Sequence, residues 1–149
     1  MNTLKFIKSP YLSIRKSGGL LLAIFSTVGA AKMGLSIANA GFEPVNGNYT
    51  AQPHTTVPAS FDQVCKAQGW NTAKMWSRLN GDREWYKHES NPSYVYYNQG
   101  DEKWWIDGPD GLGVYITSPT PYQTTPPDQG WNLIQKHVQN PDLPNVRAN

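Results

Sequence analysis

The sequence predicts a mainly β, small α+β fold: a five-stranded antiparallel meander with one short helix before it and an extended Pro-rich cover after it. Short segments rich in aromatic and β-branched residues recur about every nine or ten residues and are separated by turn residues, as in a meander. Aromatic residues often stand in adjacent pairs within these segments, and all six Trp lie between Trp70 and Trp131. We therefore assign residues 59–131 to one aromatic-rich β-domain.

The helix is predicted from the stretch SFDQVCKAQGW, residues 60–70. Ser60 and Gln63 have the spacing of a capping box, and Gly69 is a typical helix end. Phe61, Val64 and Cys65 share one face at positions i, i+3 and i+4, so this face is expected to pack on the sheet.

The five strands are predicted between turn signals. Asn80-Gly81 is the dipeptide of a tight hairpin, because both residues tolerate positive φ. The segment before it and the four after it are short and rich in rings or β-branched residues. The five segments are KMWSRL, EWYKH, YVYYN, KWWID and VYIT.

Paired rings are expected to occupy both faces of this sheet. Successive side chains of a strand point to opposite faces, so Tyr96 and Tyr97, or Trp104 and Trp105, place one ring on each side. The helix can cover one face. The other face needs the flanking segments of the chain or a partner.

The flanking segments lack a clear period. Residues 43–58 are rich in Pro, Asn, Thr and Gly and are predicted to form a linker or arm, while residues 119–131 are predicted to be an extended Pro-rich cover. Residues 132–149 form a C-terminal tail with a predicted short helix around Leu133, Ile134 and Val138, followed by a frayed end.

The first part of the chain, residues 1–42, is predicted to be a targeting segment or a membrane anchor. It carries five basic and no acidic residues and contains an uncharged run over residues 17–31. An export signal cleaved after Ala40, an organellar transit sequence and a retained membrane helix over residues 19–42 all remain open. Lys32 inside such a helix would cost about 3 kcal/mol. The protein is therefore expected to be exported or organellar, in a lumen or attached to a membrane, and not free in the cytosol.

Charge and cysteine content exclude several classes of function. Beyond residue 42, eight basic side chains face all 11 acidic ones, so the body offers no basic surface for nucleic-acid phosphates. A single cysteine, Cys65, allows no intrachain disulfide and no zinc cage. We expect no cofactor and no metal.

Residues 80–131 carry a series of motifs: NGDREWYKHE, YVYYN, WWID, GLGVYI and PPDQGW. In this order and approximate spacing the series resembles a small aromatic-rich β-domain of algal, protist and marine-invertebrate proteins. The resemblance covers roughly a third of the chain. It implies a binding or structural module, and it provides no active residues to transfer, since no enzymatic activity is established for that domain.

Two sets of side chains are candidates for contact with a ligand or partner. Exposed rings on a sheet face can stack on sugars or dock a protein, and alternation selects Trp85, Tyr97, Trp105 and Tyr115. In the competing interpretation these rings form the core.

Asp107 and Asp110 lie in the run WWIDGPDG. A pair of carboxylates could support glycoside hydrolysis, but Asp in such turns usually bonds the local backbone. A calcium loop would need further oxygen ligands that are missing here.

The sequence favours a non-catalytic interaction or accessory subunit, possessing an aromatic face and Pro-rich segments for contact with a protein partner or a larger membrane complex. A peripheral subunit of a photosynthetic or respiratory membrane complex is one instance. A carbohydrate-binding module that uses exposed Trp and Tyr is the alternative, and a carboxylate-pair hydrolase is a distant third.

Overall fold

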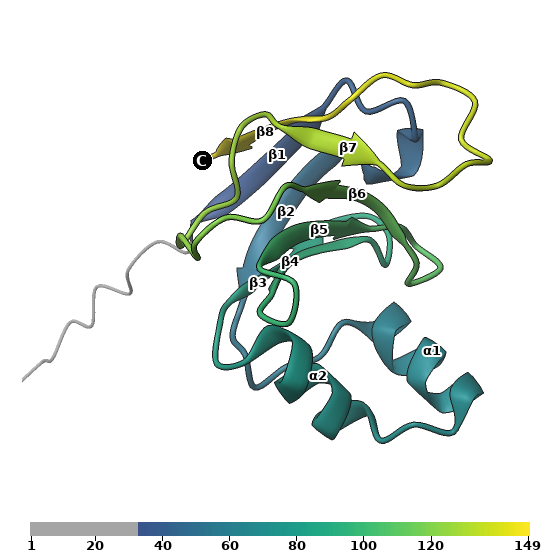
Figure 1. Cartoon of the computed structure of the whole chain (residues 1–149), viewed down its shortest axis with the longest axis vertical. Helices are drawn as coiled ribbons and strands as arrows, with labels where there is room; N and C mark the ends of the chain where they lie inside the picture. The colour runs from purple at the N-terminus through teal and green to yellow at the C-terminus, as the bar shows by residue number, and fades with distance from the viewer. Residues whose placement is uncertain (1–32) are drawn as a thin grey trace, which may run out of the picture. The chain divides into compact units, whose positions relative to one another are not determined.

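The computed structural model describes residues 33–149, which form an eight-stranded antiparallel sheet and two α-helices (Figure 1). The predicted targeting or anchor segment lies, up to residue 32, outside the described residues. The elements are β1 (Gly34–Ala38), a 3-10 helix (Glu43–Val45), β2 (Gly47–Gln52), α1 (Ala59–Gln68), α2 (Thr72–Asn80), β3 (Trp85–His88), β4 (Tyr94–Asn98), β5 (Lys103–Asp107), β6 (Gly113–Thr117), β7 (Trp131–Leu133) and β8 (Asn145–Ala148).

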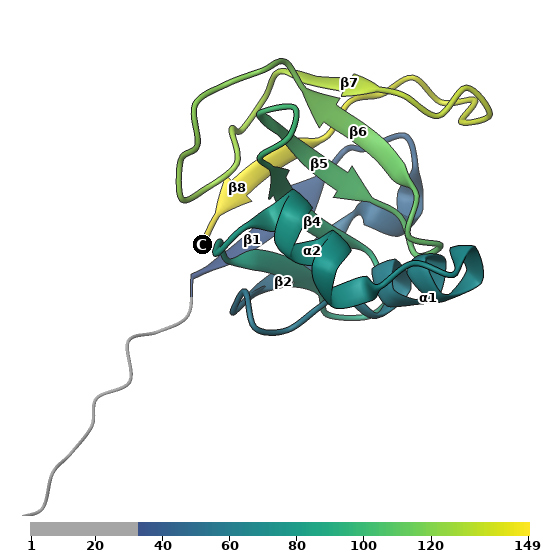
Figure 2. The same ribbon diagram turned by 60° about the horizontal axis from the view of Figure 1, so that its bottom comes forward.

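The strands follow the order β7-β6-β5-β4-β3-β2-β1-β8, and the sheet curls into a half-barrel. Its two ends meet at one point: the backbone N–H of Val146 in β8 donates to the carbonyl of Asp128, just before β7, at 2.9 Å. Both helices lie on one side of the sheet, over the outer, convex face (Figures 1 and 2). The predicted mainly β class is confirmed, with more strands than the five expected.

The first predicted helix is confirmed as α1, and it ends as expected at Gly69, whose φ of 71° is left-handed. Its start differs from the prediction. The helix begins at Ala59, and Ser60 does not cap it, because the Ser60 hydroxyl donates to the carbonyl of Pro92 at 2.9 Å. This bond ties α1 to the turn before β4.

The first predicted strand, KMWSRL, is wrong: these residues belong to α2. Asn71 caps the helix by accepting a hydrogen bond from the backbone N–H of Lys74 at 2.9 Å, and Trp76 and Asn80 are buried at helical spacing. Gly81 is the residue after the helix, with φ of 64°, and it donates to the carbonyl of Ser77. The Asn80-Gly81 pair therefore ends a helix instead of turning a hairpin.

The four remaining predicted strands correspond to β3 to β6, and four further strands come from segments assigned other roles. β1 lies in the predicted targeting segment, β2 in the predicted arm, and β7 and β8 in or beside the predicted tail. The predicted helix around Leu133 and the frayed end are both wrong. β1 and β2 bury alternate residues in the half-barrel interior, β7 buries Trp131 and β8 buries Val146, and this tertiary packing outweighs the weak local pattern.

β1 is an internal strand of the sheet. It pairs with β2 on one side and with β8 on the other, and both Leu35 and Ile37 are buried. Ala40 is also held, because its N–H and its carbonyl both bond the side-chain amide of Asn46. The first strand of the described sheet thus lies inside the segment assigned to targeting, and scission after Ala40 would remove it. The structure describes no helix long and apolar enough to span a membrane within residues 33–149.

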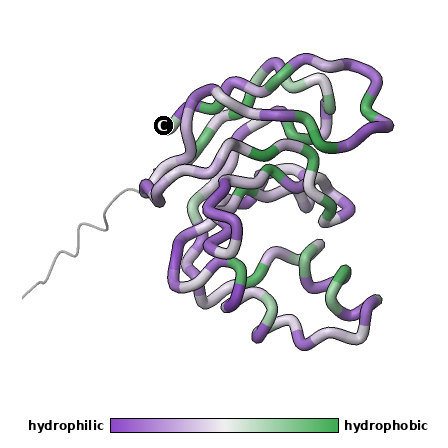
Figure 3. The backbone as a smooth tube through the Cα atoms, in the orientation of Figure 1, coloured by the Kyte–Doolittle hydropathy of each residue, from purple (hydrophilic) through white to green (hydrophobic). Residues whose placement is uncertain are grey.

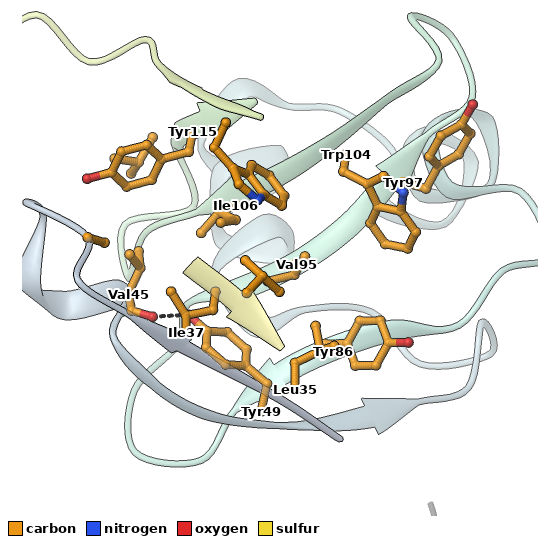
Figure 4. Packing of buried hydrophobic residues seen from close by; sticks show 14 of the residues in the cluster. Leu35, Ile37, Val45, Tyr49, Tyr86, Val95, Tyr97, Trp104, Ile106 and Tyr115 are labelled. Carbon is orange, nitrogen blue, oxygen red and sulfur yellow. Dashed lines mark hydrogen bonds between the residues drawn. The ribbon is translucent and has the colours of Figure 1, made fainter. Parts of the chain in front are cut away.

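The concave interior of the half-barrel holds the larger hydrophobic core (Figure 4). Tyr49 lies among aliphatic side chains there and donates its hydroxyl proton to the carbonyl of Val45 at 2.6 Å. The chain's own segments close this side. Tyr97 donates to the carbonyl of Thr120, and Tyr86 to that of Thr124, so the predicted Pro-rich cover lies over the interior as expected.

The outer core lies between the convex face and the two helices. It comprises Phe61, Cys65, Trp76, Trp85, Tyr94 and Tyr96. Trp76 of α2 is central to it and contacts four rings edge-on or tilted. Along the backbone, hydrophobic and hydrophilic residues alternate, whereas the long connection between β7 and β8 is mostly hydrophilic (Figure 3).

Candidate interaction surface

The helices cover only part of the outer sheet face. α2 contacts β4, and both helices pack on the rings of β3 and β4, whereas β5, β6 and β7 continue beyond them. The outward side chains of this continuation include both polar and apolar residues, and the apolar ones are partly exposed. We call Trp105, Leu112, Ile116 and Ile134 the outer strip.

The register of β5 and β6 places two members of the strip side by side. Trp105 is the direct partner of Ile116, so both side chains point to the same face. Ile116 in turn pairs with Asn132 of β7, which is exposed. The strip therefore runs across the strands from the edge of α2 toward the sheet edge at β7.

Trp105 is held in one orientation by its polar and apolar contacts. The indole Nε1–H donates to the carboxylate of Asp101, at 3.0 Å to Oδ2 and 3.3 Å to Oδ1. One side of the ring packs against the outer core under α2. The indole is therefore fixed before any partner arrives, which reduces the entropy lost on binding.

Gly113 makes this ring position available. A Cβ at Gly113 would lie 2.5 Å from Cζ3 of Trp105 and 3.1 Å from Cδ1 of Ile134. Any larger residue at this position would overlap the indole where it now lies. Opposite Gly113 the pairing of β5 and β6 is irregular, and Asp107 pairs directly with Gly113. Bulges of this kind re-aim side chains.

Leu112, directly before β6, is 49% exposed, and Ile134, directly after β7, is 38% exposed. The loop before Leu112 is built by its own turn bonds, since Asp110 accepts from the N–H of Leu112 at 3.0 Å. Gly111, with φ of 78°, lies against Ser60 of α1, where a Cβ would come within 2.7 Å of the carbonyl oxygen. The loop thus packs against α1 at Gly111, and the next residue, Leu112, is exposed to solvent.

Acidic side chains stand at both ends of β5, on the two flanks of the strip. Asp101 and Glu102 belong to the β4–β5 turn, and Asp110 belongs to the β5–β6 loop, so they lie at opposite ends of β5. Glu102 and Asp110 are exposed. The strip is therefore an apolar surface with a mainly acidic border that also includes Lys103, half-buried on β5.

Three of the four rings predicted from alternation are buried, and the four do not share a face. Trp85 and Trp105 lie on the outer face, while Tyr97 and Tyr115 point into the interior. Trp85 is covered by the arm, because its Nε1–H donates to the carbonyls of Pro53 and Thr56. Only Trp105 is partly exposed.

The two interior rings are closed in by chain segments that precede β2 and follow β6. The Tyr115 hydroxyl accepts from the N–H of Phe42 at 2.9 Å. Tyr97 is packed by Tyr122 at 5.1 Å between ring centroids, and the guanidinium of Arg83 lies over both of these rings. These contacts make the concave aromatic face part of the core.

Asp107 and Asp110 differ in environment. Asp110 is exposed and serves the local turn, as expected of an Asp in this motif. Asp107 is 5% exposed, on the outer face of β5, and accepts a hydrogen bond from the Tyr94 hydroxyl at 2.8 Å, while its Oδ1 has no partner within residues 33–149. Burial raises the pKa of Asp107 to about 7, and the bond from Tyr94 only partly offsets this. Protein covers Asp107, so a glycoside could reach it only after local unfolding.

The aliphatic members of the strip, Leu112, Ile116 and Ile134, were not predicted. Their signal is present in the sequence, because alternation from a β5–β6 pairing would place Ile116 beside Trp105. It could not be used without the extent of helix coverage and the presence of β7.

The chain matches no known protein-family model, no curated protein and no solved structure. Within residues 33–149 no group of three or more His, Cys, Asp or Glu side chains is arranged to hold a metal ion. The outer strip is therefore assessed from its own geometry.

Proposed function

We propose that this protein is a non-catalytic interaction subunit that docks on a protein partner through the outer strip. The observation that carries the proposal is the fixed, partly exposed indole of Trp105, which is bordered on its β6 side by partly exposed aliphatic residues. Trp is enriched among the residues that dominate binding energy, and such anchors are usually surrounded by near-neutral contacts that exclude water.

The chemistry of the strip defines the partner. Aliphatic side chains on the β6 and β7 side of Trp105 favour an apolar protein surface, and the acidic residues at the two ends of β5 favour basic residues around it. The export or membrane attachment expected from residues 1–42 would place this partner in a lumen or at a membrane. In this proposal the chain is an accessory subunit, and an organellar photosynthetic or respiratory complex is one setting for it.

Site-specific crosslinking in the source organism tests the proposal. A photoreactive residue is placed at Ile116 or Ile134, and the matched control carries it at Lys87, which is exposed on the outer face of β3. We expect one discrete protein adduct from the two strip positions and none from Lys87. Equal adducts from all three positions, or none from the strip, would contradict the proposal.

A second variant separates binding from folding. Ile134→Lys leaves Trp105 in place and puts a charge on the exposed end of the strip, so it should lower crosslinking at Ile116 without lowering the melting temperature by more than a few degrees. Removing an anchor such as Trp105 costs about 2 kcal/mol of binding energy or more, roughly a 30-fold loss of affinity.

A carbohydrate ligand is the second candidate. It is favoured by one specific contact, the Asp101 carboxylate beside an indole whose face is partly exposed, because sugars combine ring stacking with hydrogen bonds to carboxylates. Retention on a glycan column that free sugar reverses, and that Trp105→Ala abolishes, would favour this candidate over the protein partner.

A further inference from the structure

The outer face of the sheet has a second uncovered part, on the side opposite the outer strip. Here the outward residues of β1, β2 and β3 are polar: Ser36, Asn48, Thr50 and Lys87. The register pairs Asn48 with Ser36 and Thr50 with Lys87, which places these side chains on one surface. This polar surface is unsuited to an apolar partner.

Asn48-Tyr49-Thr50 has the Asn-x-Thr pattern that accepts N-linked glycans in the secretory pathway. Because side chains alternate along a strand, the middle one of the three points to the opposite face from the other two. Tyr49 is buried in the interior, while Asn48 and Thr50 are both exposed on the outer face. The two residues that define the acceptor site are therefore on the protein surface. The residue between them, Tyr49, packs in the core and holds the strand in place.

A glycan on Asn48 is compatible with every bond of the strand. The carbonyl of Asn48 accepts from the N–H of Glu89 at 2.9 Å, and the structure gives its side-chain amide no hydrogen bond within residues 33–149. The other candidate triplet, Asn91-Pro92-Ser93, has proline at the excluded middle position. Its side chains are also in use, since the Asn91 amide donates to the carbonyl of Pro44 and Ser93 is buried.

We propose that Asn48 is an N-glycosylation site and that its glycan covers the polar part of the outer face, leaving the outer strip free. A bulky, hydrated group here would keep β1 and β2 from associating with other proteins and would leave only the strip for docking. The inference rests on residues 1–42 being an export signal or membrane anchor that directs the chain into the secretory pathway, not an organellar transit sequence, and it does not depend on the identity of the partner.

The test is translation of the full chain in the presence of endoplasmic-reticulum microsomes. We expect a protease-protected product that migrates more slowly and returns to its unmodified mobility after endoglycosidase treatment. Asn48→Gln and Thr50→Ala should abolish the slower band, and Thr50→Ser should retain it. Asn91→Gln is the matched control and should have no effect.

The outcomes separate the two assumptions. A chain that is protected from protease but not modified would overturn the glycosylation site while leaving export intact. A chain that is neither protected nor modified would overturn both. A slower band that persists in Asn48→Gln would assign the modification to another residue and also overturn the proposal.

Discussion

Substitution of Asp107 by Asn should make the protein more stable at neutral and alkaline pH. The carboxyl of Asp107 is buried on β5 with one hydrogen bond, from Tyr94, and one unpartnered oxygen. Its pKa is raised by this burial from the ordinary value of 3.8 to about 7. Asn keeps an acceptor for Tyr94 and removes the charge.

The magnitude follows from the pKa difference. The folded protein binds the proton of Asp107 more tightly than the unfolded chain, so this group lowers the free energy of unfolding as pH rises from about 4 to about 7. A difference of roughly 3 pKa units corresponds to about 4 kcal/mol. Below pH 4 both states are protonated and the effect is absent, and above pH 7 it is complete.

Urea unfolding between pH 4 and pH 8 measures this effect. The natural protein should lose stability over that range relative to Asp107→Asn, and the two curves should diverge by about 4 kcal/mol at pH 8. Asp82→Asn is the matched control, because Asp82 is exposed and does not contribute to the raised pKa of Asp107, and its curve should run parallel to that of the natural protein. Parallel curves for the natural protein and Asp107→Asn would refute the reasoning.

Three further predictions concern stability. Gly113→Ala should displace the Trp105 indole, because the new Cβ would overlap the ring. We expect a loss of about 1 to 3 kcal/mol in the free energy of unfolding and a shift in Trp fluorescence. An unchanged emission spectrum would count against this prediction. Tyr49→Phe should cost about 1 to 3 kcal/mol by thermal unfolding, since the carbonyl of Val45 loses its buried donor, and a neutral result would show that another group replaces it. A chain that starts at Gly41 lacks β1, whereas a chain that starts at Met33 retains it. We expect circular dichroism to show that the first is unfolded and the second is folded. A folded Gly41 start would show that β1 is dispensable.

Local pattern predicted the parts of the fold that depend on neighbouring residues. The segments that became β3 to β6 are bounded by turn residues and rich in rings, and α1 ends at a glycine with positive φ, so sequence and structure agree there. The α2 error has a local cause. Asn80-Gly81 is as suitable for ending a helix as for turning a hairpin, and the cap at Asn71 was the missed signal.

The strands that were missed depend on residues far away in the chain. β1 finds one of its partners more than a hundred residues later, where Leu35 pairs with Ala148, and no local period reveals such a pairing. Long-range contacts also decide which predicted contact residues are exposed, and the sequence pattern does not reveal these contacts. Trp105 was among the predicted contact residues, but its difference from Trp85 arises only because the arm covers Trp85 and no described segment covers Trp105.

The pairing of β1 with β8 also sets the order in which the protein can mature. β1 remains without one neighbour until residues 145–148 have been synthesised, so the sheet is completed only after those residues are available. Until then β1 exposes an unpaired strand edge, which is open to pairing with other chains.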